Sequence, residues 1–180
     1  MNAANKITLS RIIMIPIFMV CLLGDFRCAE IIAVALFLLA AVTDSLDGYV
    51  ARKYNQITTF GKFIDPLADK LLVIAAIIGL VFQGRVGPWF AFVIIAREFI
   101  VTGLRMLAVA EGGKVIAAEV SGKIKTVTQI VAITALLIDK IYEIRLFEIN
   151  ISYIFLVIAV AMTLYSGVEY LIRNRSLIKQ

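Results

Sequence analysis

The segment from Asp44 to Lys70, DSLDGYVARKYNQITTFGKFIDPLADK, carries four aspartates beside two strongly apolar runs. Asp44 and Asp47 are three residues apart, and Asp65 and Asp69 are four apart, so helices would place each pair on one face. On insertion scales, an aspartate inside a membrane costs roughly 2.5–3.5 kcal/mol. Four such groups at one place therefore need a compensating charge, and the rest of the sequence has to supply or bind it.

The composition is typical of an integral membrane protein. Of the 180 residues, 62% are hydrophobic and 17% are charged, and the mean hydropathy is +0.97. Six apolar runs are found at about 7–24, 30–51, 63–82, 87–110, 124–139 and 149–172. All six are expected to be helices, because the bilayer core offers backbone groups no outside partner. We expect an all-α polytopic membrane protein with six transmembrane helices and one domain over 1–180.

The distribution of basic residues predicts the orientation. With the amino terminus inside, eleven Lys and Arg residues fall on the inner side and four on the outer side, which favours two cytosolic termini in the cytoplasmic membrane. The formal charge of +5 then indicates attraction to anionic lipids rather than to nucleic acid, because no separate basic domain is present. Alternatively, the first run could be a cleaved secretory signal, although no convincing A-x-A site follows it.

Divalent cations are the favoured compensation for the aspartates. Two ions carry a charge of +4, and carboxylate oxygens are the hard ligands that Mg²⁺ and Mn²⁺ prefer. Two metal ions at one cytosolic pocket suggest phosphate chemistry, since such a pair can clamp a diphosphate. The alternatives are pairing with Arg52, Lys62 and Lys70, or a pathway for cations or protons through a transporter.

Small residues and a proline in the same segment leave further alternatives open. Gly48 and Ala51 could let a flat ligand approach the backbone, or could form a small-x-x-small helix contact. Asp65 could cap the third helix with Pro66 in its first turn, or the helix could be distorted there. Asp139, near the end of a span, is expected to face solvent.

The segment resembles the CDP-alcohol phosphotransferase family. The pattern Asp44-x-x-Asp47-Gly48-x-x-Ala51-Arg52, followed after eight residues by Gly61-x-x-x-Asp65-x-x-x-Asp69, matches the family motif at every position. The resemblance implies that the chain transfers a phosphatidyl or similar group from a CDP-linked donor to an alcohol, releases CMP and uses two divalent ions. It also implies a homodimer and a donor, CDP-diacylglycerol, that reaches the site from the membrane lipids.

The same resemblance implies roles for individual residues. Asp44, Asp47, Asp65 and Asp69 would contact the metal ions, and Asp69 would also be the catalytic base. Because the chain contains no histidine, a carboxylate is the available proton acceptor. The residues that would border the nucleotide are Asp47, Gly48, Ala51, Arg52 and Gly61, with Asn5 and Thr8 of the first span.

Three further stretches resemble the bacterial members whose acceptor is sn-glycerol 3-phosphate: NKITLSR at 5–11, the pair AREF and GLR within 96–105, and SGKIKTVTQ at 121–129. Inositol phosphate, serine or phosphatidylglycerol are alternative acceptors within the family. Cations near the inner ends of the fourth and fifth spans would bind the acceptor phosphate, namely Arg105, Lys123, Lys125 and Arg97. Alternatively, the two lysines could anchor lipid headgroups, and Arg97 could pair structurally with Glu98.

Overall fold

The computed structural model describes residues 3–53, 59–110, 120–142, 145–146 and 149–175, with side chains described at 9–43, 70–108, 120–139, 141 and 150–175. The described chain contains α1 (Ala3–Leu23), α2 (Ala29–Lys53), α3 (Thr59–Phe82), α4 (Pro88–Ala110), α5 (Val120–Tyr142) and α6 (Ile151–Arg173). The all-α prediction is confirmed. One small addition was not expected, an antiparallel pair of two-residue strands, β1 (Arg145–Leu146) and β2 (Ile149–Asn150), between α5 and α6.

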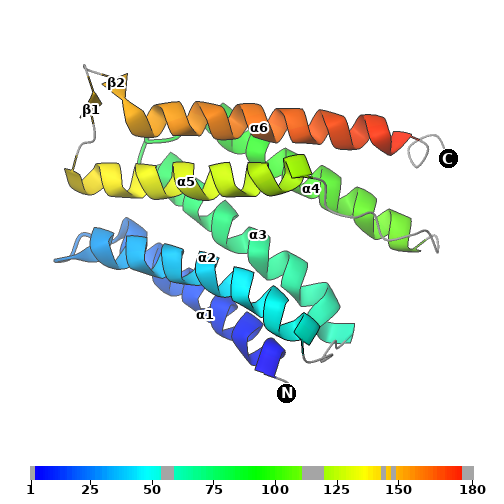
Figure 1. Cartoon of the computed structure of the whole chain (residues 1–180). Coiled ribbons are helices and arrows are strands. Elements are labelled where there is room, and N and C mark those ends of the chain that lie inside the picture. The colour runs from blue at the N-terminus through cyan, green and yellow to red at the C-terminus, as the bar shows by residue number, and fades with distance from the viewer. Residues whose placement is uncertain (1–2, 54–58, 111–119, 143–144, 147–148, 176–180) are drawn as a thin grey trace.

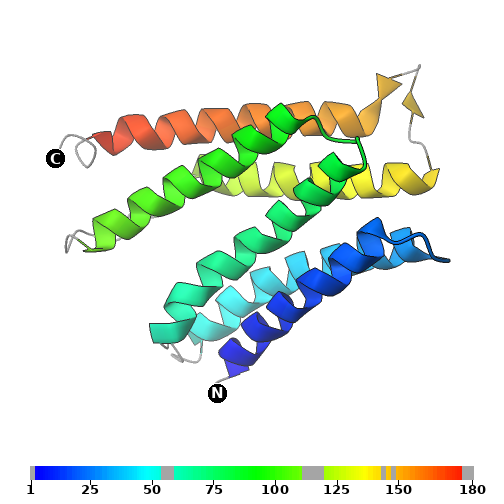
Figure 2. The same cartoon turned by 180° about the vertical axis from the view of Figure 1, so that it is seen from behind.

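The helices form two groups. Helix α1 packs against α2 and α3, whereas α6 packs against α5 and α4. Figures 1 and 2 show α5 and α6 running side by side, with α1 and α2 as a second pair and α3 crossing between the groups. Contacts of α2 and α3 with α5 join the two groups. This arrangement leaves one side of α4 and α5 facing α1, α2 and α3.

The apolar core lies where the groups meet. Phe18, Phe37, Ile77 and Leu80 are almost completely buried there. Helices α1 and α3 approach so closely that a Cβ atom at Gly79 would lie 2.3 Å from Leu22 Cδ2. Membrane bundles commonly use small residues at such crossings, because van der Waals packing is the main attraction available to helices in lipid.

A polar network holds one end of the bundle together. The Arg85 guanidinium, just before α4, donates to the Leu136 carbonyl at 2.6 Å and to Asp139 Oδ2 at 3.2 Å. Asn150 Nδ2 donates to the same Asp139 oxygen at 3.0 Å, while Asn150 Oδ1 caps α6 by accepting from the Tyr153 amide. We call Arg85, Asp139 and Asn150 the distal clamp. The expectation that Asp139 faces solvent was wrong, because its side chain is buried and binds Arg85 and Asn150.

The described helices include segments that could cross a membrane. Among the described residues, α5 over Val120–Asp139 and α6 over Ile151–Arg173 are long and apolar enough to cross a membrane, and shorter apolar stretches occur at Leu9–Leu23, Ala29–Thr43 and Lys70–Phe82. Large apolar side chains such as Phe82 and Trp89 are exposed on the outside of the bundle, as expected for contact with lipid. The described residues form six helices, the same number as the predicted spans, and the six-span topology stays a prediction.

Candidate active site

The four motif aspartates lie on two neighbouring helices. Asp44 and Asp47 fall in the last turns of α2, and Asp65 and Asp69 fall in the first half of α3. Figures 1 and 2 both show the end of α2 beside the beginning of α3. The helical spacing places each pair on one face of its helix. The backbone thus brings the two acid-bearing segments together, and the mutual orientation of the carboxylates lies outside the described residues.

The residues predicted to border the nucleotide occupy the same region. Gly48, Ala51 and Arg52 belong to α2, Gly61 belongs to α3, and Asn5 and Thr8 belong to α1. Their side chains also lie outside the described part. One alternative can be rejected: α3 begins at Thr59, so Pro66 lies inside the helix, well beyond its first turn, and Asp65 does not cap it.

A cavity of about 430 Å³ opens between the two helix groups. Its described lining comes from every helix except α6 and contains six basic side chains and one acidic side chain. The basic side chains are Arg11, Lys70, Arg97, Arg105, Lys123 and Lys125, and the acidic one is Glu98. We call this space the basic cavity. The structure therefore brings together all four residues that were predicted to bind the acceptor phosphate.

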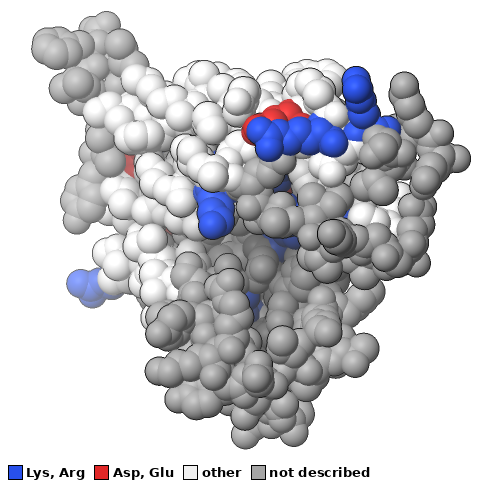
Figure 3. All heavy atoms as spheres, turned by 45° about the vertical axis from the view of Figure 1, so that its right-hand side comes forward, with Lys and Arg blue, Asp and Glu red and all other residues white. Residues whose placement is uncertain are grey.

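The basic cavity reaches the acid-bearing segment of α3. Lys70, which lines the cavity, directly follows Asp69 in the chain. Arg11 of α1 also lines the cavity and is buried. On the face shown in Figure 3, basic side chains are visible within the hollow at the middle of the molecule. One cation of the cavity lining is thus the chain neighbour of the predicted catalytic aspartate.

Glu98 joins two of the cations. Lys125 Nζ donates a hydrogen bond to Glu98 Oε1, and Arg97 Nη1 lies 3.6 Å from the same oxygen. Both Glu98 and Lys125 are buried. The interpretation of Lys125 as a lipid anchor was therefore wrong, whereas Lys123 is exposed at the cavity wall and that alternative stays open for it. Arg97 both pairs with Glu98 and lines the cavity.

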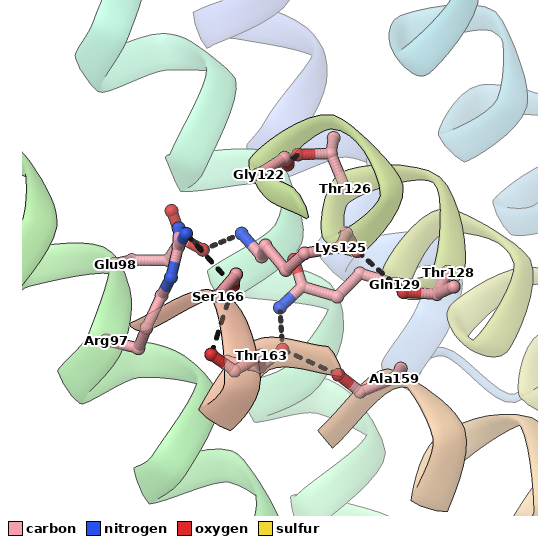
Figure 4. Close-up of polar contacts among 10 residues, drawn as sticks. All are labelled: Arg97, Glu98, Gly122, Lys125, Thr126, Thr128, Gln129, Ala159, Thr163 and Ser166. Atoms are coloured by element: carbon pink, nitrogen blue, oxygen red, sulfur yellow. Dashed lines mark hydrogen bonds and ion pairs between the residues drawn. The ribbon is translucent and has the colours of Figure 1, made fainter. Parts of the chain in front are cut away.

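Polar residues of α6 lie behind this wall, as Figure 4 shows. Arg97 Nη2 donates to Ser166 Oγ at 3.1 Å, and Gln129 Nε2 donates to Thr163 Oγ1 at 3.0 Å. The Arg105 guanidinium carbon lies 5.5 Å from the centre of the Tyr170 ring. The sequence interpretation missed these α6 residues. The available signal was the spacing of Thr163, Ser166 and Tyr170 by three and four residues within an otherwise apolar run.

An all-helical bundle with two acid-bearing helix segments and an adjoining basic cavity is an arrangement that suits divalent ions and phosphorylated ligands. The family model described as CDP-alcohol phosphatidyltransferase matches residues 1–165. The chain therefore belongs to this family, and the resemblance stated from the motif is confirmed.

Curated relatives are similar over nearly the whole chain. A Bacillus subtilis protein named CDP-diacylglycerol--glycerol-3-phosphate 3-phosphatidyltransferase is 46% identical, over 99% of this chain and 97% of its own length. A Salmonella paratyphi A protein of the same name is 38% identical, over 94% of this chain and 93% of its own. A Mycobacterium tuberculosis protein named probable phosphatidylglycerophosphate synthase is 37% identical, over 96% of this chain and 81% of its own.

Proposed function

We propose that this chain transfers the phosphatidyl group from CDP-diacylglycerol to sn-glycerol 3-phosphate, forming phosphatidylglycerophosphate and releasing CMP. Its family membership and the names of its relatives support this reaction. The structural observation that carries the proposal is the basic cavity, whose wall begins at Lys70, the residue after Asp69. A phosphorylated acceptor suits a cavity lined by six cations, because a dianion is stabilised by several charged donors at once.

The acceptor phosphate would be bound by Arg97, Arg105, Lys123 and Lys125. Arginine presents a planar fork of donors, which suits bidentate contacts to phosphate oxygens. Among the described residues, the Nε atoms of Arg97 and Arg105 are buried without a hydrogen-bond partner. Unused donors of this kind favour an anionic ligand, since leaving a buried donor unpaired is costly.

The donor nucleotide would be bound at the α2–α3 end, by Asp47, Gly48, Ala51, Arg52 and Gly61, with Asn5 and Thr8 from α1. The four motif aspartates would hold two divalent ions there. Carboxylate oxygens from these two neighbouring helix segments would form a donor set that suits Mg²⁺ or Mn²⁺. When bound, such ions neutralise charge on phosphate oxygens and stabilise a departing phosphate group.

Asp69 would act as the general base. Its carboxylate would accept the proton of the acceptor hydroxyl, and the oxygen would attack the phosphorus that carries the diacylglycerol. The new oxygen–phosphorus bond forms as the bond to the bridging oxygen of the diphosphate breaks, and CMP leaves with that oxygen. Lys70, which lines the basic cavity, directly follows Asp69 in the chain, and this supports a transfer at that end of α3.

The membrane arrangement follows from the same proposal. The chain would form one membrane domain over 1–180 with six spans in the cytoplasmic membrane, two cytosolic termini and an active site open to the cytosol. Lipid tails would enter sideways between helices, so that only the polar groups reach the aqueous mouth. Two copies would form a homodimer, as the resemblance implies.

The acceptor can be identified by supplying purified protein with CDP-diacylglycerol and one alcohol at a time. We expect CMP release with sn-glycerol 3-phosphate, and background release with inositol phosphate, serine or phosphatidylglycerol. Turnover with one of these alcohols instead would mean that the chain carries out the family reaction with a different acceptor. CMP release that did not depend on any alcohol would reject the transferase reaction.

The base and the ions can be tested together. Asp69→Asn should abolish CMP release while the protein stays inserted, because the amide cannot accept the proton. Asp25→Asn is a matched control, since Asp25 is exposed between α1 and α2 at the opposite end. A chelator should stop turnover of the wild type, and Mg²⁺ or Mn²⁺ should restore it. Full activity of Asp69→Asn, or turnover that ignores the chelator, would reject the corresponding role.

A further inference from the structure

Helix α6 contributes no residue to the described lining of the basic cavity, yet it contacts three residues that do. These contacts come from Thr163, Ser166, Gly167 and Tyr170, which follow one another at helical spacing. We call these four residues the α6 stripe. All four are buried, and three of them lie beyond residue 165, where the family match ends.

Ser166 has the geometry of a group that orients Arg97. Its hydroxyl donates to the Thr163 carbonyl at 3.2 Å, and a serine hydroxyl has only one hydrogen to donate. The oxygen is therefore left as an acceptor for Arg97 Nη2, at 3.1 Å. Figure 4 shows the Arg97 guanidinium next to both Ser166 and Glu98.

Gly167 and Tyr170 extend this support. A Cβ atom at Gly167 would lie 3.1 Å from Arg97 Cγ, which is tighter than an ordinary contact, so the glycine leaves room for the arginine stem. One turn further along, the Tyr170 ring lies under the Arg105 guanidinium at 5.5 Å. A cation over an aromatic face is held by the ring quadrupole while its N–H groups stay free at the edges.

We propose that the α6 stripe positions Arg97 and Arg105 for the phosphate of the acceptor. Ser166, Gly167 and Tyr170 are positioning residues that act through the two arginines. This inference rests on the proposed function for the identity of the acceptor. It assigns to α6 a role in acceptor affinity, while the donor nucleotide, bound at the α2–α3 end, is left unaffected.

The test compares substitutions on and off the stripe. Ser166→Ala and Tyr170→Leu should each raise the KM for sn-glycerol 3-phosphate about tenfold, the order expected for losing one hydrogen bond or one desolvated cation–π contact to a charged group. The KM for CDP-diacylglycerol should change less than about twofold. Tyr170→Phe keeps the aromatic ring, so this variant should have the wild-type KM for the acceptor.

Ser152→Ala is the matched control for Ser166→Ala. Ser152 is also a buried serine of α6, and its hydroxyl donates to the Ala135 carbonyl of α5 at 3.0 Å, but neither Ser152 nor Ala135 belongs to the described lining of the cavity. A purely structural role of α6 would make the two variants behave alike, with a lower melting temperature and unchanged KM values. That result would overturn the proposal.

A binding measurement separates this proposal from the proposed reaction. Inorganic phosphate should raise the melting temperature of the purified wild-type protein, and the rise should be smaller in Ser166→Ala and Tyr170→Leu than in Ser152→Ala and Tyr170→Phe. An equal rise in all variants, or no rise in the wild type, would overturn the positioning role. CMP release from the wild type with sn-glycerol 3-phosphate decides the reaction independently of these shifts.

Discussion

The distal clamp and the basic cavity contain similar side chains. Positive and negative charges balance in the distal clamp, whereas the described lining of the basic cavity is mostly positive. In the distal clamp, one cation, Arg85, meets one acid, Asp139, and Asn150 adds a further donor to that acid. In the basic cavity, six described cations meet a single described acid, Glu98. Both regions join α5 to neighbouring helices, so helix packing alone does not distinguish them.

The difference shows how a structural ion pair can be told from a ligand site. A cation whose charge is matched inside the protein stabilises the fold by holding elements together, and removing its partner leaves an uncompensated charge. Cations in excess repel one another and have buried donors to spare, so they become favourable when an anion binds. We therefore expect the same substitution to affect stability in one region and ligand affinity in the other.

The largest difference is expected from Arg105→Gln compared with Arg85→Gln. Loss of the cavity arginine should lower kcat/KM for sn-glycerol 3-phosphate about 100-fold, because truncating one partner of a buried charged contact costs roughly 2–5 kcal/mol. The melting temperature should change little, since the substitution relieves repulsion among cations. Arg85→Gln should do the reverse, lowering the melting temperature while kcat/KM per folded molecule stays near the wild-type value.

Steady-state kinetics and thermal melting of the two variants check this pair. If Arg105→Gln unfolded the protein and Arg85→Gln removed acceptor affinity, the assignment of the two regions would be reversed.

A smaller loss is expected when the acid of the distal clamp is removed. Asp139→Ala leaves the Arg85 guanidinium without its carboxylate and should lower the free energy of unfolding by about 2 kcal/mol, below the 3–5 kcal/mol of a fully buried pair because Arg85 is partly exposed. Asp139→Asn keeps an acceptor and should lose about half as much. Denaturant unfolding in detergent measures both, and an unchanged stability would show that the clamp contributes nothing.

The sequence predicted the acid-bearing helices well because their evidence is local. Spacings of three and four residues place Asp44 with Asp47 and Asp65 with Asp69 whatever the tertiary structure. Helix ends were less accurate: α3 begins at Thr59 rather than near residue 63, and α5 begins at Val120 rather than near 124. Hydropathy marks where the apolar run begins, whereas a helix can continue through polar residues at the membrane surface.

The basic cavity was predicted in part, and its support was missed. Arg97, Arg105, Lys123 and Lys125 are rare charges at the inner ends of apolar runs, so their gathering could be expected from topology. The contact of Ser166 with Arg97 depends on how α6 is rotated against α4. The contacts of Asp139 also depend on packing, because Arg85 is 54 residues away in the chain. Neither rotation nor packing is encoded in residue spacing.

The smallest effect is expected at the one acid of the basic cavity. Glu98 pairs with Lys125 and lies near Arg97, so it competes with an incoming phosphate for the same two cations. Glu98→Gln removes this competition while keeping an oxygen that can accept from Lys125. The KM for sn-glycerol 3-phosphate should fall about threefold, which is well under the tenfold change that corresponds to 1.4 kcal/mol. The melting temperature should fall by a few degrees, because the buried cations lose their counter-charge. Glu169→Gln gives the control, because the partly buried Glu169 pairs with Arg173 on the same helix and is not in the described lining of the cavity. A rise in the acceptor KM of Glu98→Gln would instead mean that Glu98 orders the two cations for binding, and that charge balance alone does not govern the cavity.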